Sequence, residues 1–225
     1  MDLRIMNSQF LSPLIVSLQV AIIGGAIAII AGTVIAYLMN KYQFRGKTAL
    51  EILFLMPIVL PPSVIGFLLL VTIGASSPLY PLIELLFGQT IIFTKTAAII
   101  AASIVAFPIM YQSAKIAFNH IDPEIIDAAK LDQATEVEII KYITVPMAIF
   151  GLATGAVLAL ARAFGEFGAT LMVAGNIPGK TETLPIAIYM AMAANERQMA
   201  AIYVAMMIVT SVIFLLIVKK LSKYS

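Results

Sequence analysis

Long uncharged apolar runs, separated by short polar segments, dominate the pattern of this sequence. Five of them are long enough, or nearly so, to cross a membrane, and they cover residues 14–39, 52–73, 96–114, 142–161 and 198–218. A bilayer core about 30 Å thick needs about 20 consecutive apolar residues of α-helix. The pattern therefore predicts an all-α integral membrane protein with about five transmembrane helices.

Two shorter apolar runs cover residues 76–93, which Glu84 interrupts, and residues 183–195. Both contain prolines and are too short or too broken to span a bilayer readily, so we expect interfacial or re-entrant helices there. A sixth span is possible if one of them does cross. We expect the fourth long run to continue past Arg162 to about Met172, as a long and tilted helix.

Three prolines, Pro57, Pro61 and Pro62, interrupt the second long run. Each removes a backbone donor and frees carbonyl groups, which a membrane tolerates only where neighbouring helices or a cavity satisfy them. The prolines therefore predict a broken span. The pattern leaves open whether the break is a packing kink or shapes a pore.

Composition supports a membrane protein and excludes several other classes. The 225 residues are 61% hydrophobic and only 12% charged, whereas soluble domains carry about 25% charged residues. The absence of cysteine excludes disulfides, thiolate metal sites and cysteine nucleophiles, and the single histidine, His120, leaves little material for acid–base chemistry. A net charge of +2 is too small to indicate nucleic acid binding. We expect no metal site and no catalytic residues in this chain.

The distribution of lysine and arginine predicts the orientation in the membrane. With five spans and the segment 40–49 in the cytoplasm, nine basic residues face the cytoplasm: Lys41, Arg45, Lys47, Lys115, Lys130, Lys141, Lys219, Lys220 and Lys223. Four lie outside: Arg4, Lys95, Lys180 and Arg197. The positive-inside rule then places the N terminus outside and the C terminus inside.

The segment between the third and fourth spans is unlike the rest of the chain, because half of the twelve acidic residues lie in it: Asp122, Glu124, Asp127, Asp132, Glu136 and Glu138. One interpretation is a solvated acidic loop. The other is a projection that docks into a groove on a cytoplasmic partner, since the small side chains of Ala128 and Ala129 allow a partner surface to approach closely.

Helix-start signals divide this segment into two short helices. Asp122 followed by Pro123 is an N-cap with proline at the first helical position. We expect the first helix to stop near Gln133. The second is expected to start at Thr135, where Thr135 and Glu138 form an S/T-x-x-E capping box.

The predicted helices carry a shallow apolar face. Ile121, Ile125, Ala128 and Ala129 fall at helical spacing and predict an apolar stripe on the first helix. The second helix runs toward Pro146, which is expected to open or kink the fourth span.

Residues 127–146 resemble the EAA loop of the permease subunits of ATP-binding-cassette (ABC) importers. The matching residues are Asp127, Ala128, Ala129, Gln133, Ala134 and Pro146. Asp127 stands where that family usually has Glu, and Gln133 where it usually has Gly. If position 133 is left-handed, a residue other than Gly costs roughly 1–2 kcal/mol there. The resemblance implies that these residues couple the chain to an ATPase.

Two further segments, residues 55–70 and 161–189, are similar to the molybdate-transport branch of that family. The sharpest matches are the run GEFGAT at 165–170 and the turn GNIPG at 175–179. Sulfate and tungstate permeases share parts of this pattern. The resemblance covers most of the chain.

The resemblance implies a type I ABC importer permease fold, with residues 1–225 as a single transmembrane permease domain and a cytoplasmic coupling loop at 119–146. It implies a cell-membrane permease subunit that imports molybdate or tungstate by ATP-driven alternating access. The partners implied are a second copy of the chain, two cytoplasmic ATP-binding subunits and an extracytoplasmic oxyanion-binding protein. ATP and Mg²⁺ would then be bound by the ATPase, with no cofactor in this chain.

The resemblance also suggests a translocation path or gate formed by Pro57, Pro61, Pro62, Gly165, Glu166, Gly168 and Thr170. Three alternatives to molybdate import remain open at this point. One is a permease for sulfate or thiosulfate. A second, from a different class, is a secondary transporter or channel that works alone, for which an internal inverted repeat and charged residues at mid-membrane would be typical. A structural membrane subunit without transport is a third.

Two helix faces carry further patterns. Gly24, Ala28 and Gly32 repeat at four-residue spacing, which predicts close helix packing, within the chain or against a second copy. Arg162 and Glu166 also lie four residues apart on one helical face. Ionisable groups near a bilayer usually face the protein interior or water. Arg162 and Glu166 therefore form either an ion pair that fixes helix packing or part of the translocation path.

The segment AGNIPGKT at residues 174–181 is one residue short of a phosphate-binding P-loop, because Ala174 stands in place of the first glycine. A P-loop follows a strand and precedes a helix, but here a membrane span precedes the segment. The predicted topology also places it outside, away from cytoplasmic ATP. We therefore do not expect it to bind nucleotide.

Overall fold

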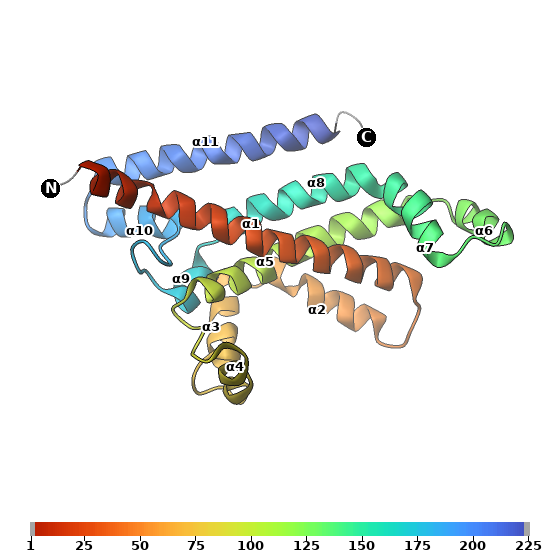
Figure 1. The fold of residues 1–225 in the computed structure, drawn as a ribbon, viewed down its shortest axis with the longest axis horizontal. Helices are drawn as coiled ribbons and strands as arrows, with labels where there is room; N and C mark the ends of the chain where they lie inside the picture. Colours follow the sequence, from red (N-terminus) through yellow and green to blue (C-terminus); the bar gives the residue numbers. More distant parts are fainter. Residues whose placement is uncertain (1–2, 223–225) are drawn as a thin grey trace.

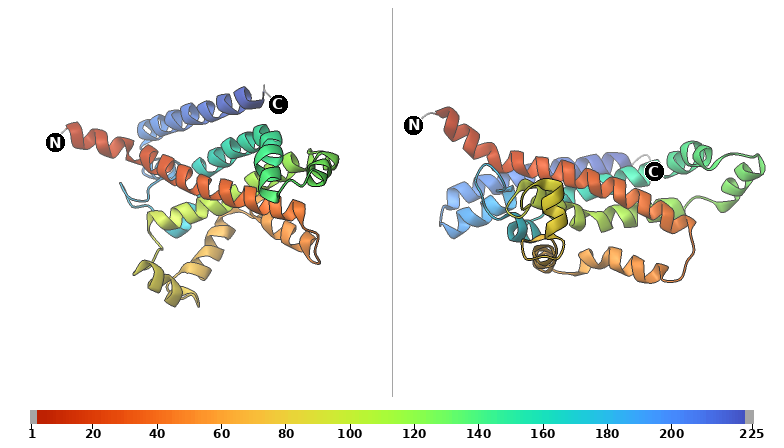
Figure 2. Two further views of the ribbon diagram at one scale, coloured as in Figure 1. Left: turned by 45° about the vertical axis from the view of Figure 1, so that its right-hand side comes forward. Right: turned by 60° about the horizontal axis from the view of Figure 1, so that its bottom comes forward.

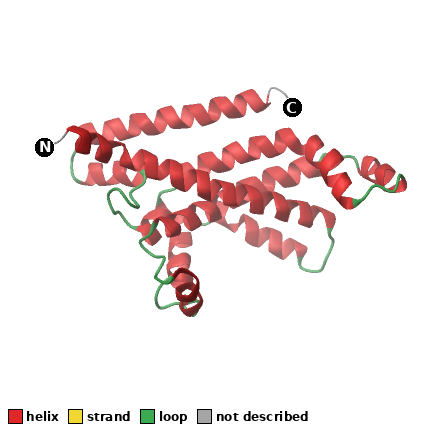
Figure 3. Ribbon diagram, viewed as in Figure 1, coloured by secondary structure: helices red, strands yellow, loops and turns green. Residues whose placement is uncertain are grey.

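The computed structural model describes the backbone of residues 3–222 and the side chains of residues 10–220, and these residues form helices and loops without strands (Figure 3). The helices are α1 (Leu3–Lys41), α2 (Lys47–Val59), α3 (Pro62–Ile73), α4 (Tyr80–Phe87), α5 (Lys95–Asn119), α6 (Pro123–Leu131), α7 (Glu136–Ile139), the π-helix η1 (Ile140–Thr144), α8 (Val145–Phe164), α9 (Gly168–Ala174), α10 (Leu184–Ala193) and α11 (Arg197–Ser222) (Figure 1).

Within the described residues, four helical segments are long and apolar enough to cross a membrane on their own: Phe10–Lys41, Lys95–Asn119, Glu136–Phe164 and Arg197–Lys220. A fifth span forms only if α2 and α3 are counted together. The predicted all-helical membrane architecture is confirmed. The two short apolar runs form α4, of 8 residues, and α10, of 10 residues, which are too short to span a bilayer alone.

The second predicted span, residues 52–73, is not a straight helix. It divides into α2 and α3, which are bent by 116° at the break. Leu60 (ψ 137°) and Pro61 (ψ 138°) are both extended, because a residue that precedes proline is excluded from the helical region. Pro62 then begins α3 as its first residue. Pro57 lies inside α2 without ending it, so the break is made by the Pro61–Pro62 pair.

The expected continuation of the fourth span to Met172 is wrong. α8 ends at Phe164, and Gly165 is its C-cap residue. Phe167 (φ −124°, ψ −59°) is not helical, and a separate short helix, α9, follows from Gly168. The described chain is therefore broken twice within its apolar segments.

A close three-helix body of α1, α5 and α8 forms the centre of the molecule (Figures 1 and 2). A Cβ on Gly24 would lie 3.0 Å from the carbonyl oxygen of Ile99, and one on Gly32 would lie 2.9 Å from the Cβ of Met110. Ala28, between them on the same stripe, is buried. The predicted small-residue stripe therefore packs α1 on α5 within one chain.

The other helices extend from this body. α6 and α7 project beyond one end, α10 lies at the opposite end, and α3 and α4 stand out to one side (Figures 1 and 2). α11 packs on α8 and α10 and leaves most of its apolar surface exposed, as expected of a helix that faces lipid.

Candidate functional site

The projecting loop begins with the predicted cap of α6. The Asp122 carboxylate accepts a hydrogen bond of 3.0 Å from the backbone N–H of Glu124, and Pro123 is the first residue of the helix. Proline costs nothing at this position because its missing N–H has no intrahelical acceptor. The start of the helix is thus confirmed as the sequence predicts it.

α6 ends in a left-handed turn at Gln133 (φ 62°). The N–H of Gln133 donates to the Lys130 carbonyl and the N–H of Ala134 to the Ala129 carbonyl, both at 3.0 Å. These two bonds form a Schellman motif, which favours glycine at its left-handed position. The expected stop near Gln133 is confirmed, and the geometry explains why the related pattern has glycine where this chain has glutamine.

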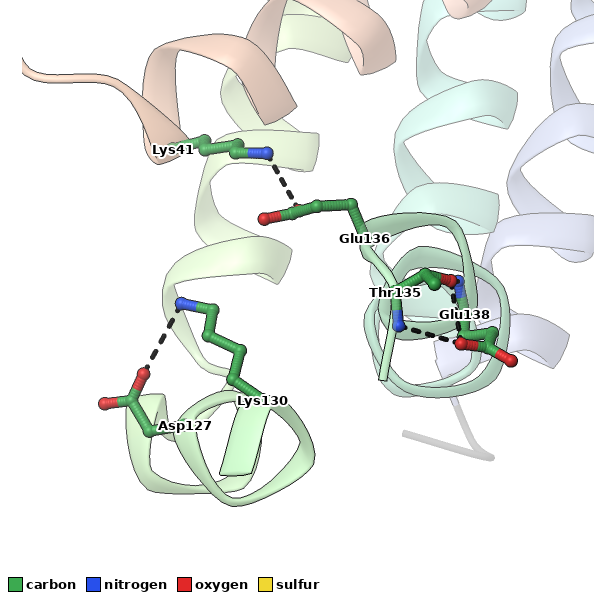
Figure 4. Close-up of polar contacts among 6 residues, drawn as sticks. All are labelled: Lys41, Asp127, Lys130, Thr135, Glu136 and Glu138. Carbon is green, nitrogen blue, oxygen red and sulfur yellow. Dashed lines mark hydrogen bonds and ion pairs between the residues drawn. The ribbon is translucent and has the colours of Figure 1, made fainter. Parts of the chain in front are cut away.

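α7 begins with the predicted capping box. The N–H of Glu138 donates to the Thr135 hydroxyl at 3.4 Å, and the Glu138 carboxylate accepts from the N–H of Thr135 at 2.8 Å (Figure 4). Between α7 and α8 the chain forms the π-helix η1, directly before Pro146 in the first turn of α8. Pro146 therefore lies where the helix widens. The sequence predicted a kink or start at Pro146 but not the π-helix.

The apolar stripe predicted on α6 is partly wrong. Ile121 precedes the helix and is buried against the bundle, whereas Ile125 remains 40% exposed. The most exposed large apolar side chains of the loop are Leu131, at 85%, and Val137, at 72%, neither of which was singled out from the sequence. Ala128 is exposed as well. We call Ile125, Ala128, Leu131 and Val137 the apolar tip.

Behind the apolar tip lies a pocket of about 410 Å³ between α6, α7 and the ends of α1 and α5. Its walls include Tyr37, Asn40, Phe118, Ile126 and Lys130. Asp127 also lines this pocket and pairs with Lys130 at 3.5 Å, while its side chain remains 70% exposed to solvent (Figure 4).

A second feature of the loop was not found from the sequence. The Lys41 ammonium, on the last residue of α1, pairs with the Glu136 carboxylate, on the first residue of α7, at 2.8 Å (Figure 4). The two residues are 95 positions apart, and no local pattern relates them.

The two broken spans meet at one place inside the molecule, where α3 packs on α9. A Cβ on Gly168 would lie 3.0 Å from the Cβ of Pro62. One on Gly66 would lie 3.0 Å from the Cα of Ala169. The structure thus brings together the two segments that the sequence suggested for a path or gate. We call this contact the break junction.

Glu166 lies at the break junction with its side chain almost fully buried, at 2% exposure. Its carboxylate accepts from the Arg162 guanidinium at 2.8 Å and from the N–H of Ala169, in the first turn of α9, also at 2.8 Å. The ion pair left open by the sequence is therefore formed. It joins the end of α8 to the start of α9 across the break.

The remaining path residues differ in their surroundings. Thr170 is fully buried on α9, and its hydroxyl has no hydrogen-bond partner. Gly165 caps α8. Pro57 lies apart from the break junction, on an apolar pocket of about 330 Å³ between α1, α2 and α5.

The P-loop-like segment 174–181 connects α9 to α10, at the opposite end of the molecule from α6 (Figure 1). It turns through Gly175 (φ 66°) and Gly179 (φ 75°), and a helix rather than a strand precedes it. It therefore lacks the strand–loop–helix context of a phosphate-binding loop.

Comparisons with known proteins agree with this geometry. Residues 10–223 match the family model described as "Binding-protein-dependent transport system inner membrane component". The chain is 48% identical over 213 residues to a putative molybdenum transport system permease protein of Bacillus subtilis, which covers 95% of this chain and 94% of that protein. It is 35% identical to the molybdenum transport system permease protein ModB of Escherichia coli K12, over 78% of this chain and 76% of that protein.

A solved structure shares the fold. A bacterial ABC transporter involved in the import of the polysaccharide alginate matches 96% of this chain and 78% of its own chain, with a TM-score of 0.74 and 16% identity. The break junction and the projecting loop are thus parts of a type I ABC importer permease fold. The chain belongs to the family of binding-protein-dependent transport system inner membrane components, the multi-pass permease subunits of ABC importers.

Proposed function

We propose that this chain is the permease subunit of an importer for molybdate or tungstate. In the complete transporter, two copies of the chain would form a shared translocation path. Two ATPase subunits would bind the cytoplasmic loops, and an oxyanion-binding protein would deliver the ion to the outer face. The substrate class rests on the similarity to the molybdenum transport permeases over almost the whole chain.

The observation that carries the assembly with an ATPase is the apolar tip. Leu131 and Val137 expose most of their side chains on a loop that projects beyond the membrane-spanning helices. Large apolar side chains gathered in contact with water on one projecting loop suit a binding interface. The short helix α6 has the form of a projection that fits a groove on a partner.

ATP and Mg²⁺ would be bound by the ATPase subunits, and the residues of this chain would receive the resulting motion. ATP binding would draw the two ATPases together and displace both loops. This displacement would switch the shared cavity between inward and outward access. Asp127, Ala129, Gln133 and Ala134 would hold the shape of α6, the docking helix of this proposal, since Asp127 pairs with Lys130 and the other three belong to its C-terminal turn.

The path residues belong to the same proposal. Polar hydroxyl and amide groups suit a tetrahedral oxyanion better than a ring of fixed cations, because a deep cationic site would slow its release. Thr170, with its buried and unpartnered hydroxyl, is the residue of the break junction that best fits such a role. Glu166 fits a structural role, because its charge is already paired with Arg162.

The test is reconstitution in liposomes with the candidate ATPase and binding protein, and with molybdate, tungstate or sulfate supplied in turn. We expect molybdate or tungstate to stimulate ATP hydrolysis and to accumulate inside. Ala128→Asp, which places a charge in the apolar tip, should prevent the ATPase from copurifying. Ala194→Asp makes the same change on an exposed residue at the opposite end and should not.

Each outcome separates the alternatives. Stimulation by sulfate alone would support the assignment as an ABC permease and would show that sulfate, rather than molybdate or tungstate, is its substrate. Uptake by the chain without any ATPase subunit would instead indicate a secondary transporter. Normal ATPase binding by Ala128→Asp would overturn the docking role of the apolar tip.

A further inference from the structure

α6 is weakly attached to the rest of the molecule. Within the described residues it makes no extensive contact with any other helix. Ile126 packs on the core beneath it, and the pocket of about 410 Å³ separates much of its inner face from α1 and α5. The docking helix therefore has room to move relative to the bundle.

The ion pair between Lys41 and Glu136 crosses this pocket. Their ion pair of 2.8 Å joins the end of α1 to the start of α7, and both residues line the pocket (Figure 4). In the described part of the chain it is the only hydrogen bond or ion pair between the segment 123–139 and α1. The other polar contacts of that segment, including Lys130 with Asp127 and Thr135 with Glu138, lie within the loop.

The helix at the other end of the pair is held firmly. α1 packs on α5 and α8 along most of its length. A Cβ on Gly25 would lie 2.5 Å from the Leu160 side chain of α8, and one on Gly32 would lie 2.9 Å from the Met110 side chain of α5. The loop is already joined to α5 through residues 120–122 and to α8 through η1, so the ion pair adds α1 as a third fixed point.

We propose that Lys41 and Glu136 are positioning residues that hold the docking helix at a fixed angle to the α1–α5–α8 body, so that motion of the ATPase reaches the membrane helices. The inference rests on the proposed function of the loop. Both side chains are partly exposed, and exposed pairs contribute little to stability. Their effect is therefore expected in the geometry of the loop rather than in folding.

The first test needs only the full chain in lipid nanodiscs. Because the sequence contains no cysteine, Leu38→Cys on α1 and Asp132→Cys at the end of α6 can carry spin labels without competing thiols. We expect Lys41→Glu to broaden the distribution of distances between the labels. Adding Glu136→Lys, which restores the pair in reverse, should narrow it again. An unchanged distribution in Lys41→Glu would overturn the proposal.

The second test uses the complete transporter. It measures the uptake of radiolabelled molybdate and the hydrolysis of ATP in the same preparation. Lys41→Glu should lower the number of ions transported per ATP by about threefold, with recovery in the double reversal. The matched control is Arg45→Glu, an identical charge change in the α1–α2 connection. Arg45 has no ion-pair partner among the residues that the structure describes, so the number of ions transported per ATP should stay unchanged.

The two proposals fail in different ways. If the ATPase binds Ala128→Asp normally, the docking role of the loop is wrong, whatever the ion pair does. If the ATPase fails to bind Ala128→Asp while Lys41→Glu transports as many ions per ATP as the wild type, the loop docks but the ion pair does not transmit its motion. High salt should reduce the ratio of the wild type toward that of Lys41→Glu, because screening weakens exposed pairs.

Discussion

The projecting loop and the break junction are held together differently. The shape of the loop depends on local hydrogen bonds, namely the Asp122 cap, the turn at Gln133 and the capping box of Thr135 and Glu138, and one long-range ion pair joins it to α1. The break junction depends on the packing of two distant segments, α3 and α9, beside a buried carboxylate whose own hydrogen bonds are local. One region is exposed and lightly attached, and the other is buried and closely packed.

This difference indicates that the two regions have different mechanical roles. Local bonds let α6 keep its shape while it moves as a unit, which suits the docking role that we propose for it. Tight packing at the break junction resists independent motion of α3 and α9, so the two broken spans are expected to move together. Substitutions should therefore affect stability most at the junction and least in the loop.

The largest effect is expected from Glu166→Ala. This change removes the partner of Arg162 and the acceptor of the Ala169 N–H, at a position with almost no access to solvent. The cost should be about 2–4 kcal/mol, because a broken buried pair leaves desolvated groups without compensation. Thermal unfolding in detergent measures it. Glu166→Gln keeps an oxygen acceptor for the N–H and should fall between wild type and Glu166→Ala; equal stability of all three would contradict this account of the junction.

A smaller loss is expected from Gly66→Ala. The new methyl group would meet the Cβ of Met172 at 2.9 Å and the Cα of Ala169 at 3.0 Å, and backbone at this distance must shift. Overpacking of this kind costs about 1–3 kcal/mol. The matched control is Gly165→Ala, where the nearest atom lies at 3.6 Å and the backbone φ is negative. Similar melting temperatures for the two variants would show that α3 and α9 are not closely packed.

The sequence predicts the loop far better than the break junction. The physical reason is the separation along the sequence between the residues that interact. The caps at Asp122 and Thr135 depend on residues two or three positions away, so their hydrogen bonds follow from the order of residue types. The apolar stripe was partly wrong because helical spacing was extended to Ile121, which precedes the first turn of α6.

Contacts between distant segments left no comparable signal. Pro61 and Pro62 predicted a break, but neither its angle nor the packing of Gly66 against Ala169 could be derived from one segment alone. The break after Phe164 was missed because no proline marks it, and the predicted helix was extended across Gly165 and Glu166 into the apolar residues that follow. The pairing of Lys41 with Glu136 depends on where two helices end in space.

The smallest effect, a gain in stability rather than a loss, is expected from substituting glycine for a left-handed residue, as in Gln133→Gly. Gln133 is left-handed (φ 62°), a conformation that costs a residue with a Cβ about 1 kcal/mol relative to glycine. The substitution should slow hydrogen exchange of the α6 amides and leave the melting temperature of the bundle unchanged, because the loop is attached so lightly. Asn195→Gly is the matched comparison: Asn195 (φ 61°) ends α10 in the same kind of turn, but asparagine tolerates this conformation, so its gain should be smaller. Equal gains in protection from hydrogen exchange at both sites would mean that the strain at Gln133 is already relieved by the loop around it. A rise in the melting temperature would show that the loop and the bundle unfold together.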